Sequence, residues 1–324
     1  MFKKIFKVIK KYDNIVLARH IGVDTDAMAS QVALRDTIKM TFPEENVYAV
    51  GSGGAKFPYL GKLDTFDGNY SKTLLIVLDT PDKRRVDCEN IDLFDYKIKI
   101  DHHPFIETFC DLELIDDKAS SACELLMRMI YDTKLIVDKC IMEKLFLGLV
   151  SDTNRFMFSN STSTTFDIVG KVLRDYELNI PDLYALLYSR PLKEIKLQGY
   201  MSESMKVTEN GVGYMVISDE VIKSYDVDVA SSGNLINNFN YIEEVLVWLA
   251  VTQDTKNNLF KINIRSRGPV INKIAENYNG GGHRLASGAK VQTMDEVECL
   301  IKDLDKACLE YISERGEMDE NNWC

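Results

Sequence analysis

The sequence YKIKIDHHP, residues 96–104, joins a strand-like run to three potential metal ligands. Residues 96–100 predict a short strand, and Asp101, His102 and His103 follow directly at its carboxyl end. The chain contains only four histidines, so two adjacent histidines beside a carboxylate stand out as a candidate site.

Two other apolar runs end in the same way, residues 14–18 and residues 74–78. Continuous apolar runs of this length are typical of strands that are buried on both faces of a parallel sheet. The polar residues that follow them are His20, Asp24, Asp26 and Asp79. Because ligands bind at the carboxyl ends of strands in open α/β sheets, we expect all these side chains to converge.

Helical patterns alternate with these runs and predict an α/β fold with a doubly wound, mainly parallel sheet. The expected helices cover residues 27–40, 119–131, 138–150 and 163–175. The composition changes near Pro181, and further strand patterns follow later in the chain. We therefore expect a site-bearing domain over residues 1–180, a helical connector over residues 181–206 and a smaller α/β domain over residues 207–324. A substrate is expected to bind in a cleft between the two domains.

A fourth carboxylate, Asp152, follows the helix expected over residues 138–150. It would complete a cluster of two imidazoles and four carboxylates, and such a cluster repels itself unless cations neutralise it. Imidazole and carboxylate ligands suit Mn²⁺, and also Fe²⁺, Co²⁺ or Zn²⁺. The pattern thus predicts two divalent metal ions, with manganese as the expected metal, that activate a water for phosphate ester hydrolysis.

The composition is that of an ordinary globular protein, and the net charge of the 324 residues is −11. An acidic chain lacks the basic surface that grips long nucleic acid, so a phosphate-bearing substrate should be small. No apolar run is long enough to span a membrane, and residues 2–9 predict an amphipathic helix packed on the body, with a membrane surface as the alternative. Seven scattered cysteines without a CxxC motif predict free thiols and a cytoplasmic location.

These motifs together resemble those of the DHH phosphoesterases, a family named for the triplet found here at positions 101–103. The first motif is His20-Ile21-Gly22-Val23-Asp24-Thr25-Asp26-Ala27, the second is Asp79 and the fourth is Asp152. The run Gly280-Gly281-Gly282-His283-Arg284, with Arg265-Ser266-Arg267 upstream, is similar to the DHH-associated C-terminal domain. Domain order and length resemble the nano-RNase and pAp phosphatase group. Val23 and Thr25 replace a proline and a glycine common in the family, and they leave the ligand set intact.

The resemblance implies a role for each residue of the site. One ion would be held by His20, Asp24 and Asp79, and the other by Asp26, Asp79, His102 and Asp152, with Asp79 as the bridge. Asp101 and His103 would be the catalytic residues, Asp101 orienting an imidazole and His103 facing the substrate phosphate. The substrate would also be held by Arg265, Arg267, Gly281, Gly282, His283 and Arg284.

Three functions agree with these features. The first is hydrolysis of very short oligoribonucleotides, and of 3′-phosphoadenosine 5′-phosphate (pAp), to mononucleotides by metal-activated water. The second is cleavage of pApA or cyclic di-AMP in second-messenger turnover, and the third is a catalytically dead nucleotide-binding module. The intact ligand set argues against the third, and the glycine-histidine run argues against an inorganic pyrophosphatase. The resemblance also allows a homodimer.

Each motif has a simpler explanation when it is taken alone. Asp24 and Asp26 could cap a helix, and the glycine run could be a flexible loop. Arg265 and Arg267 lie on one face of an alternating strand and could be solvated charges. The joint occurrence of the motifs, in one order and at strand ends, favours the metal-site interpretation.

Overall fold

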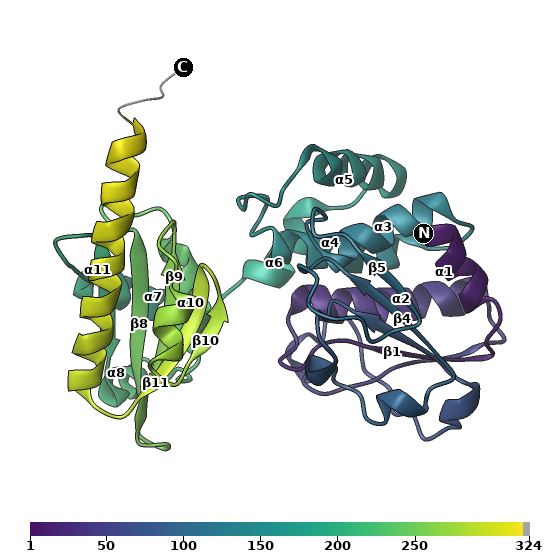
Figure 1. The fold of residues 1–324 in the computed structure, drawn as a ribbon, viewed down its shortest axis with the longest axis horizontal. Helices are drawn as coiled ribbons and strands as arrows, with labels where there is room; N and C mark the ends of the chain where they lie inside the picture. Colours follow the sequence, from purple (N-terminus) through teal and green to yellow (C-terminus); the bar gives the residue numbers. More distant parts are fainter. Residues whose placement is uncertain (320–324) are drawn as a thin grey trace. The chain divides into compact units, whose positions relative to one another are not determined.

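The computed structural model describes residues 1–319 and divides the chain into two compact units (Figure 1). The first unit ends at Ser189 and the second begins at Arg190. The helix Ile180–Tyr188 (α6) therefore belongs to the first unit, and the helix Leu192–Ser204 (α7) belongs to the second. No helix within residues 1–319 is long and apolar enough to cross a membrane.

The first unit is built on a five-stranded, fully parallel sheet with the strand order β2-β1-β3-β4-β5. Its strands are Asn14–Ala18 (β1), Asn46–Ala49 (β2), Leu74–Leu78 (β3), Tyr96–Asp101 (β4) and Leu112–Ile115 (β5). The chain runs from β1 to β2 in one direction and then returns past β1 to β3 in the other. The expected α/β class with a mainly parallel sheet is confirmed, and ligands bind such sheets where the strand order reverses.

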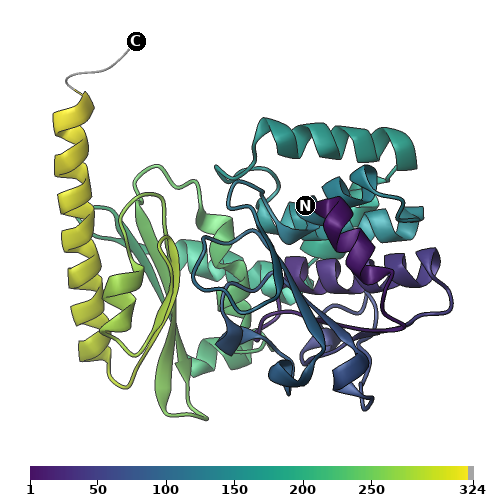
Figure 2. The same ribbon diagram turned by 45° about the vertical axis from the view of Figure 1, so that its right-hand side comes forward.

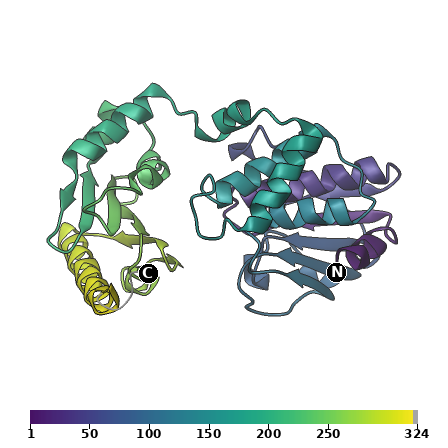
Figure 3. The same ribbon diagram turned by 90° about the horizontal axis from the view of Figure 1, so that it is seen from above.

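All α-helices of this unit pack on one face of the sheet (Figures 1 and 3). They are Phe2–Ile9 (α1), Thr25–Thr41 (α2), Ala122–Asp132 (α3), Lys139–Asp152 (α4), Ser163–Tyr176 (α5) and α6. Their apolar sides cover alternate strand residues such as Leu17 and Ile76. The other face, which presents Val16 and Val77, is covered by loops and short 3₁₀ helices that connect the strands.

The second unit contains a six-stranded mixed sheet with the order β10-β11-β9-β8-β7-β6. Its strands are Lys206–Val207 (β6), Val212–Ile217 (β7), Val247–Asp254 (β8), Leu259–Ser266 (β9), Gly281–His283 (β10) and Ala286–Val291 (β11). One face packs on Asn272–Glu276 (α10) and on Met294–Asp319 (α11), which runs alongside the sheet in Figure 2. The other face packs on α7, Asp219–Ser224 (α8) and Ser231–Leu235 (α9).

The glycine run of the second unit is part of a strand and not the flexible loop that the three glycines alone would suggest. It forms β10, which pairs antiparallel with β11. A Cβ atom on Gly280 would lie 2.0 Å from the carbonyl oxygen of Gly288, and one on Gly282 would lie 2.6 Å from that of Ala286. Close backbone packing in this hairpin therefore requires glycine, whatever else the hairpin binds.

The helical layer of the first unit is packed most tightly where α4 meets α2 and α3. A Cβ atom on Gly148 would lie 2.3 Å from Cys123 Sγ and 3.0 Å from both Ala29 Cβ and Asp26 Oδ1. We expect Gly148→Ala to lower the free energy of unfolding by about 1–3 kcal/mol, because overpacking a dense core costs about that much. Urea denaturation followed by circular dichroism measures this change.

Gly170 in α5 provides the control, because the atom nearest to its added Cβ is the Nη1 of Arg174 at an ordinary 3.5 Å. Gly170→Ala should stabilise the protein by about 0.5–1 kcal/mol through higher helix propensity. The double variant Gly148→Ala/Cys123→Ala should recover part of the loss. Equal stability of Gly148→Ala and the wild type would contradict this description of the helical layer.

Candidate metal centre

The polar residues singled out in the first unit meet at the carboxyl edge of its parallel sheet. Three strands deliver them from one side, and the start of α2 and the end of α4 deliver the rest. Their nitrogen and oxygen atoms form three overlapping groups, and within each group the atoms lie within 4.8 Å of one another. The groups are Asp79 with His102 and His103, His20 with Asp24 and Asp79, and Asp26 with His102 and Asp152.

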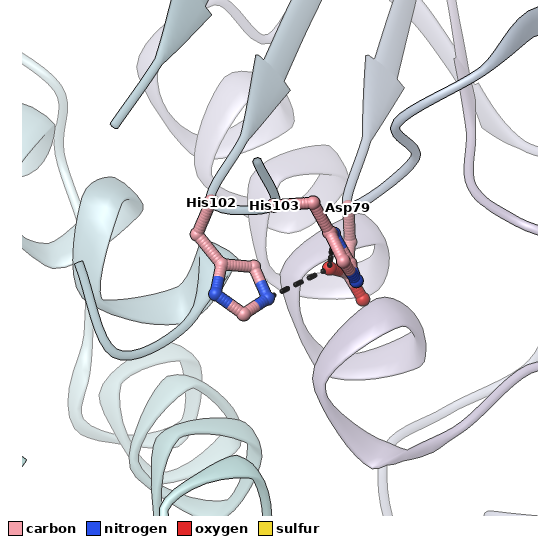
Figure 4. Close-up of side chains that lie close together, drawn as sticks. All are labelled: Asp79, His102 and His103. Carbon is pink, nitrogen blue, oxygen red and sulfur yellow. Dashed lines mark ion pairs between the residues drawn. The ribbon is translucent and has the colours of Figure 1, made fainter. Parts of the chain in front are cut away.

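Asp79 lies at the centre of this arrangement. Its Oδ2 is 3.4 Å from His20 Nε2, and its Oδ1 is 3.2 Å from His102 Nε2 and 3.5 Å from His103 Nδ1. Figure 4 shows the His102 and His103 rings beside this carboxylate. The two oxygens of Asp79 therefore face different groups of potential ligands, as the carboxylate of a bridging ligand would.

The backbone and the burial of Asp79 are both unusual. Its φ angle is +51°, which places this residue in the left-handed region directly after β3. The side chain is 2% exposed, and its Oδ1 has no hydrogen-bond partner among the described residues. A buried carboxylate oxygen without a hydrogen bond is costly, and a cation would satisfy it.

Asp26 is held by a segment that is distant in the sequence. Its Oδ2 accepts a hydrogen bond of 2.8 Å from the backbone N–H of Ala122, and its Oδ1 accepts one of 3.1 Å from that of Cys123. Both N–H groups belong to the first turn of α3, where the helix dipole favours a negative charge. The side chain of Asp26 is buried, so these contacts determine its orientation.

Asp24 combines the helix cap with a second contact. Its Oδ1 accepts a hydrogen bond of 3.0 Å from the N–H of Ala27, so Asp24 is the N-cap of α2. Its Oδ2 lies 3.5 Å from His20 Nε2. The capping explanation and the site explanation are therefore compatible, because they use different oxygens of one carboxylate.

The close approach of charged groups shifts the pKa values of several side chains in the site. Burial and the neighbouring Asp79 raise the pKa of Asp26 to about 7, and burial with the charge of Asp26 raises the pKa of Asp152 well above its usual value. Burial alone would lower the pKa of His20, but Asp24 and Asp79 together raise it to about 10. Without cations the site therefore retains protons on groups that would have to release them to bind metal.

Asp101 supports His103. Its Oδ1 lies 2.8 Å from His103 Nδ1 and accepts a hydrogen bond of 3.2 Å from the backbone N–H of His103. Asp101 is fully buried, whereas the side chain of His103 is 21% exposed. Asp101 therefore holds the orientation of the His103 ring, and the catalytic roles expected of the two residues stay predictions.

A buried arginine that the sequence pattern did not single out lies directly before His20. Arg19 is fully buried, and its guanidinium contacts the carboxylate of Asp87 and donates to the backbone oxygens of His20 and Ser52. These contacts join the ends of β1 and β2 to the segment after β3. A charged residue at the end of an apolar run was a visible signal, because such a residue requires a partner when it is buried.

In the second unit, the strand register brings two of the predicted substrate-binding residues into one row. His283 pairs with Ala286 on β11, and Ala286 pairs with Arg265 on β9. Paired residues point to the same face of a sheet, so the small Ala286 separates a histidine from an arginine. Arg265 Nε donates a hydrogen bond of 2.8 Å to Asn237 Oδ1, a contact that the sequence did not reveal.

The other residues predicted to hold the substrate lie in different surroundings. Gly281 and Gly282 form the β10 strand, and Arg284 is exposed in the turn of the hairpin. Arg267 Nη2 donates to the backbone oxygens of Ile242 and Val245, so its guanidinium supports the chain before β8. The two arginines of the Arg265-Ser266-Arg267 sequence thus have different partners.

Comparison with known proteins places both units in one family. Residues 14–150 match the family model described as the DHH family, N-terminal domain, and residues 211–310 match the DHHA1 domain. The chain is also 31% identical to the bifunctional oligoribonuclease and PAP phosphatase NrnA of Bacillus subtilis, over 96% of this chain and 100% of that protein. The chain therefore belongs to the DHH family of phosphoesterases.

One further relative agrees with this assignment, and one solved structure shares the fold. The chain is 33% identical to the probable bifunctional oligoribonuclease and PAP phosphatase NrnA of Streptococcus mutans, over 94% of this chain and 97% of that protein. The crystal structure of an exopolyphosphatase-related protein from Bacteroides fragilis has the same fold, with a TM-score of 0.80. At 24% identity over 96% of both chains, this likeness concerns the fold alone.

The pKa shifts predict how pH affects the metal-free protein. Because Asp26 retains its proton in the fold up to about pH 7, its contribution to stability falls as pH rises from its ordinary pKa of 3.8 to about 7. The contribution of His20 is fully present below pH 6.5 and is lost as pH rises through about 10. We therefore expect the melting temperature in a chelator to fall as pH rises from about 6.5 to 10.

Thermal unfolding by fluorescence, with a chelator and then with added Mn²⁺, measures this dependence. The added metal should stabilise the protein more at high pH, because protons compete for its ligands. The variant His20→Gln should show a flatter decline in the chelator. A melting temperature that rises with pH in the chelator, in both proteins, would contradict the predicted protonation of the site.

Proposed function

We propose that this chain is a phosphodiesterase and phosphatase that hydrolyses very short oligoribonucleotides and pAp to mononucleotides, using two divalent metal ions. The observation that carries the proposal is the position of Asp79 between two groups of imidazole and carboxylate ligands. The names of the relatives from Bacillus subtilis and Streptococcus mutans supply the substrate class.

The donor set fits two cations with mixed nitrogen and oxygen ligands, and we propose Mn²⁺ as the native ion. One would be held by His20, Asp24 and Asp79, and the other by Asp26, Asp79, His102 and Asp152. The buried Oδ1 of Asp79 and the protons retained by the crowded carboxylates support this assignment. When bound, the ions would supply an activated water and neutralise charge on the phosphoryl group.

The protein groups around the ions would bind and orient the phosphate. We propose that His103 donates a hydrogen bond to a phosphate oxygen, while Asp101 holds its ring in place. In the second unit, the guanidinium of Arg265 would bind the nucleotide, together with His283 in the same row of the sheet. Gly281, Gly282 and Arg284 would contribute through the hairpin, as the resemblance to the family implies.

The net charge of −11 supports a small substrate and argues against a long nucleic acid as partner. The cysteines of residues 1–319 are all free thiols, which supports a cytoplasmic location. A homodimer is compatible with the family, and size-exclusion chromatography with light scattering would test it.

Turnover in Mn²⁺ on a panel of pAp, pApA, cyclic di-AMP, di- to pentaribonucleotides and a long RNA tests the proposed function. We expect the wild type to hydrolyse pAp and the short RNAs at comparable rates and to spare the long RNA. Asp79→Asn, which suits the left-handed backbone at this position, should lower turnover by more than about 100-fold, since even outer partners of metal ligands often cost 10- to 100-fold.

Asp92→Asn is the matched control, because Asp92 is an exposed aspartate outside the site. Its Oδ1 forms an ion pair with Lys83 Nζ at 2.6 Å. Calorimetric titration with Mn²⁺ should give two sites in the wild type and weaker binding in Asp79→Asn. Preference for pApA or cyclic di-AMP over the other substrates would instead assign the chain to second-messenger turnover. Unchanged activity of Asp79→Asn would refute the two-metal proposal.

The two arginines of the second unit give a separate prediction. Arg265→Lys should raise KM for short RNA by about 10-fold, because a lysine cannot form the bidentate contact of a guanidinium, worth roughly 1.4 kcal/mol here. Arg267→Lys should mainly lower the melting temperature, because its guanidinium donates to backbone oxygens. Steady-state kinetics and thermal unfolding separate the two effects. If Arg267→Lys raises KM and Arg265→Lys does not, the assignment of these residues is reversed.

A further inference from the structure

A lysine lies buried inside the site-bearing strand β4. Lys99 is fully buried, although lysine is among the residues least often found in a protein interior. It points to the sheet face that carries Val16 and Val77, because its neighbours Ile98 and Ile100 belong to the core on the helical face. Burying an ammonium group is costly in free energy unless other groups compensate its charge. The contacts of Lys99 therefore identify the groups that it stabilises.

The ammonium of Lys99 contacts three groups around the sheet edge. Its Nζ donates a hydrogen bond of 2.9 Å to the carbonyl oxygen of Pro81, in the segment after Asp79. It lies 4.9 Å from the centre of the Phe109 ring, within range of a cation–π contact. It also lies 3.7 Å from Asp101 Oδ2.

The two oxygens of Asp101 are thereby used for different purposes. Oδ2 faces Lys99 and accepts no hydrogen bond from the described residues, so the ammonium is what compensates its burial. Oδ1 receives both the backbone N–H and the ring Nδ1 of His103. A carboxylate held in this way is an acceptor only, so its hydrogen bond with the ring requires a hydrogen on Nδ1 of His103.

We propose that Lys99 is a positioning residue of the metal centre, which acts through Asp101 to set the orientation and the tautomer of the His103 imidazole. The proposal rests on the proposed function for the role of His103 toward a phosphate, but the contact chain Lys99–Asp101–His103 is a property of the protein itself. If Lys99 only fixed the segment after Asp79, the hydrogen bond to the carbonyl oxygen of Pro81 would be sufficient. Its additional contact with Asp101 connects it to His103.

The test begins with Lys99→Met, which keeps the buried stem and removes the charge. We expect kcat/KM on the best substrate of the panel to fall about 10- to 100-fold, the usual cost of losing an outer partner of a metal site. In the His103→Gln background, Lys99→Met should cause no further loss, because its effect passes through His103. Additive losses in this cycle would overturn the proposal.

Nuclear magnetic resonance of ¹⁵N-labelled histidine gives a reading that needs neither metal nor substrate. With four histidines in the chain, His103 is assigned by its absence in His103→Gln. In the metal-free wild type at mildly alkaline pH, we expect His103 to be protonated at Nδ1, and in Lys99→Met to populate both tautomers. An unchanged tautomer in Lys99→Met would overturn the proposal, even if the enzyme proves to act on other substrates.

Lys97→Met is the matched control, because Lys97 lies two residues earlier on the same face of β4. Its Nζ forms an ion pair with Asp111 Oδ2 at 3.6 Å. This variant should leave kinetics and the His103 signal unchanged. If Lys99→Met unfolds the protein, the double variant Lys99→Met/Asp101→Asn should fold, because it lacks the unpaired carboxylate. It should show the same His103 tautomer populations as Asp101→Asn alone, because Lys99 acts through Asp101, and a further change in the double variant would overturn the proposal.

Discussion

Repulsion between carboxylates is the constraint on which the first unit depends. Four aspartates at one edge of a buried sheet are unfavourable unless each is compensated from another part of the chain. The imidazoles supply part of this compensation, and the first turn of α3 supplies hydrogen bonds to Asp26. Two buried cations beside the edge pair with further aspartates, Arg19 with Asp87 and Lys99 with Asp101. Each part of the first unit that borders the cluster therefore reduces the free-energy cost of burying its charges. These parts are the helical layer, the strand ends and the loops.

Much of this arrangement could be predicted from the sequence, because parallel strands buried on both faces leave continuous apolar runs. Residues 14–18 and 74–78 were predicted with the bounds that the structure shows. The strand Leu112–Ile115 was missed, because it is a half-buried edge strand whose pattern is broken by Glu113. The gathering of the site residues followed from their positions after strands, since chain topology alone brings such ends together.

The contacts that support the site could not be predicted. Asp26 and Ala122 are 96 residues apart, and no local pattern connects a helix start to a distant carboxylate. The burial of Lys99 could not be predicted, because burial of a lysine depends on partners that the sequence does not reveal. The same holds for Asn237, which meets Arg265 only through the folding of the second unit. The hairpin at Gly280–Gly282 shows why the flexible-loop alternative fails, since these glycines permit close packing of the backbone.

The hydrogen bonds to Asp24 and Asp26 have a consequence for how the protein would bind the proposed metals. Backbone groups of Ala27, Ala122 and Cys123 already orient these carboxylates, so these two proposed ligands are oriented without an ion. Proteins whose ligands gather only around the ion fold and load together, and chelation denatures them. In the proposed metal site, folding would therefore not depend on loading. The ions would be exchanged on the finished fold, and the metals in the surroundings, rather than the history of folding, would decide which ions bind.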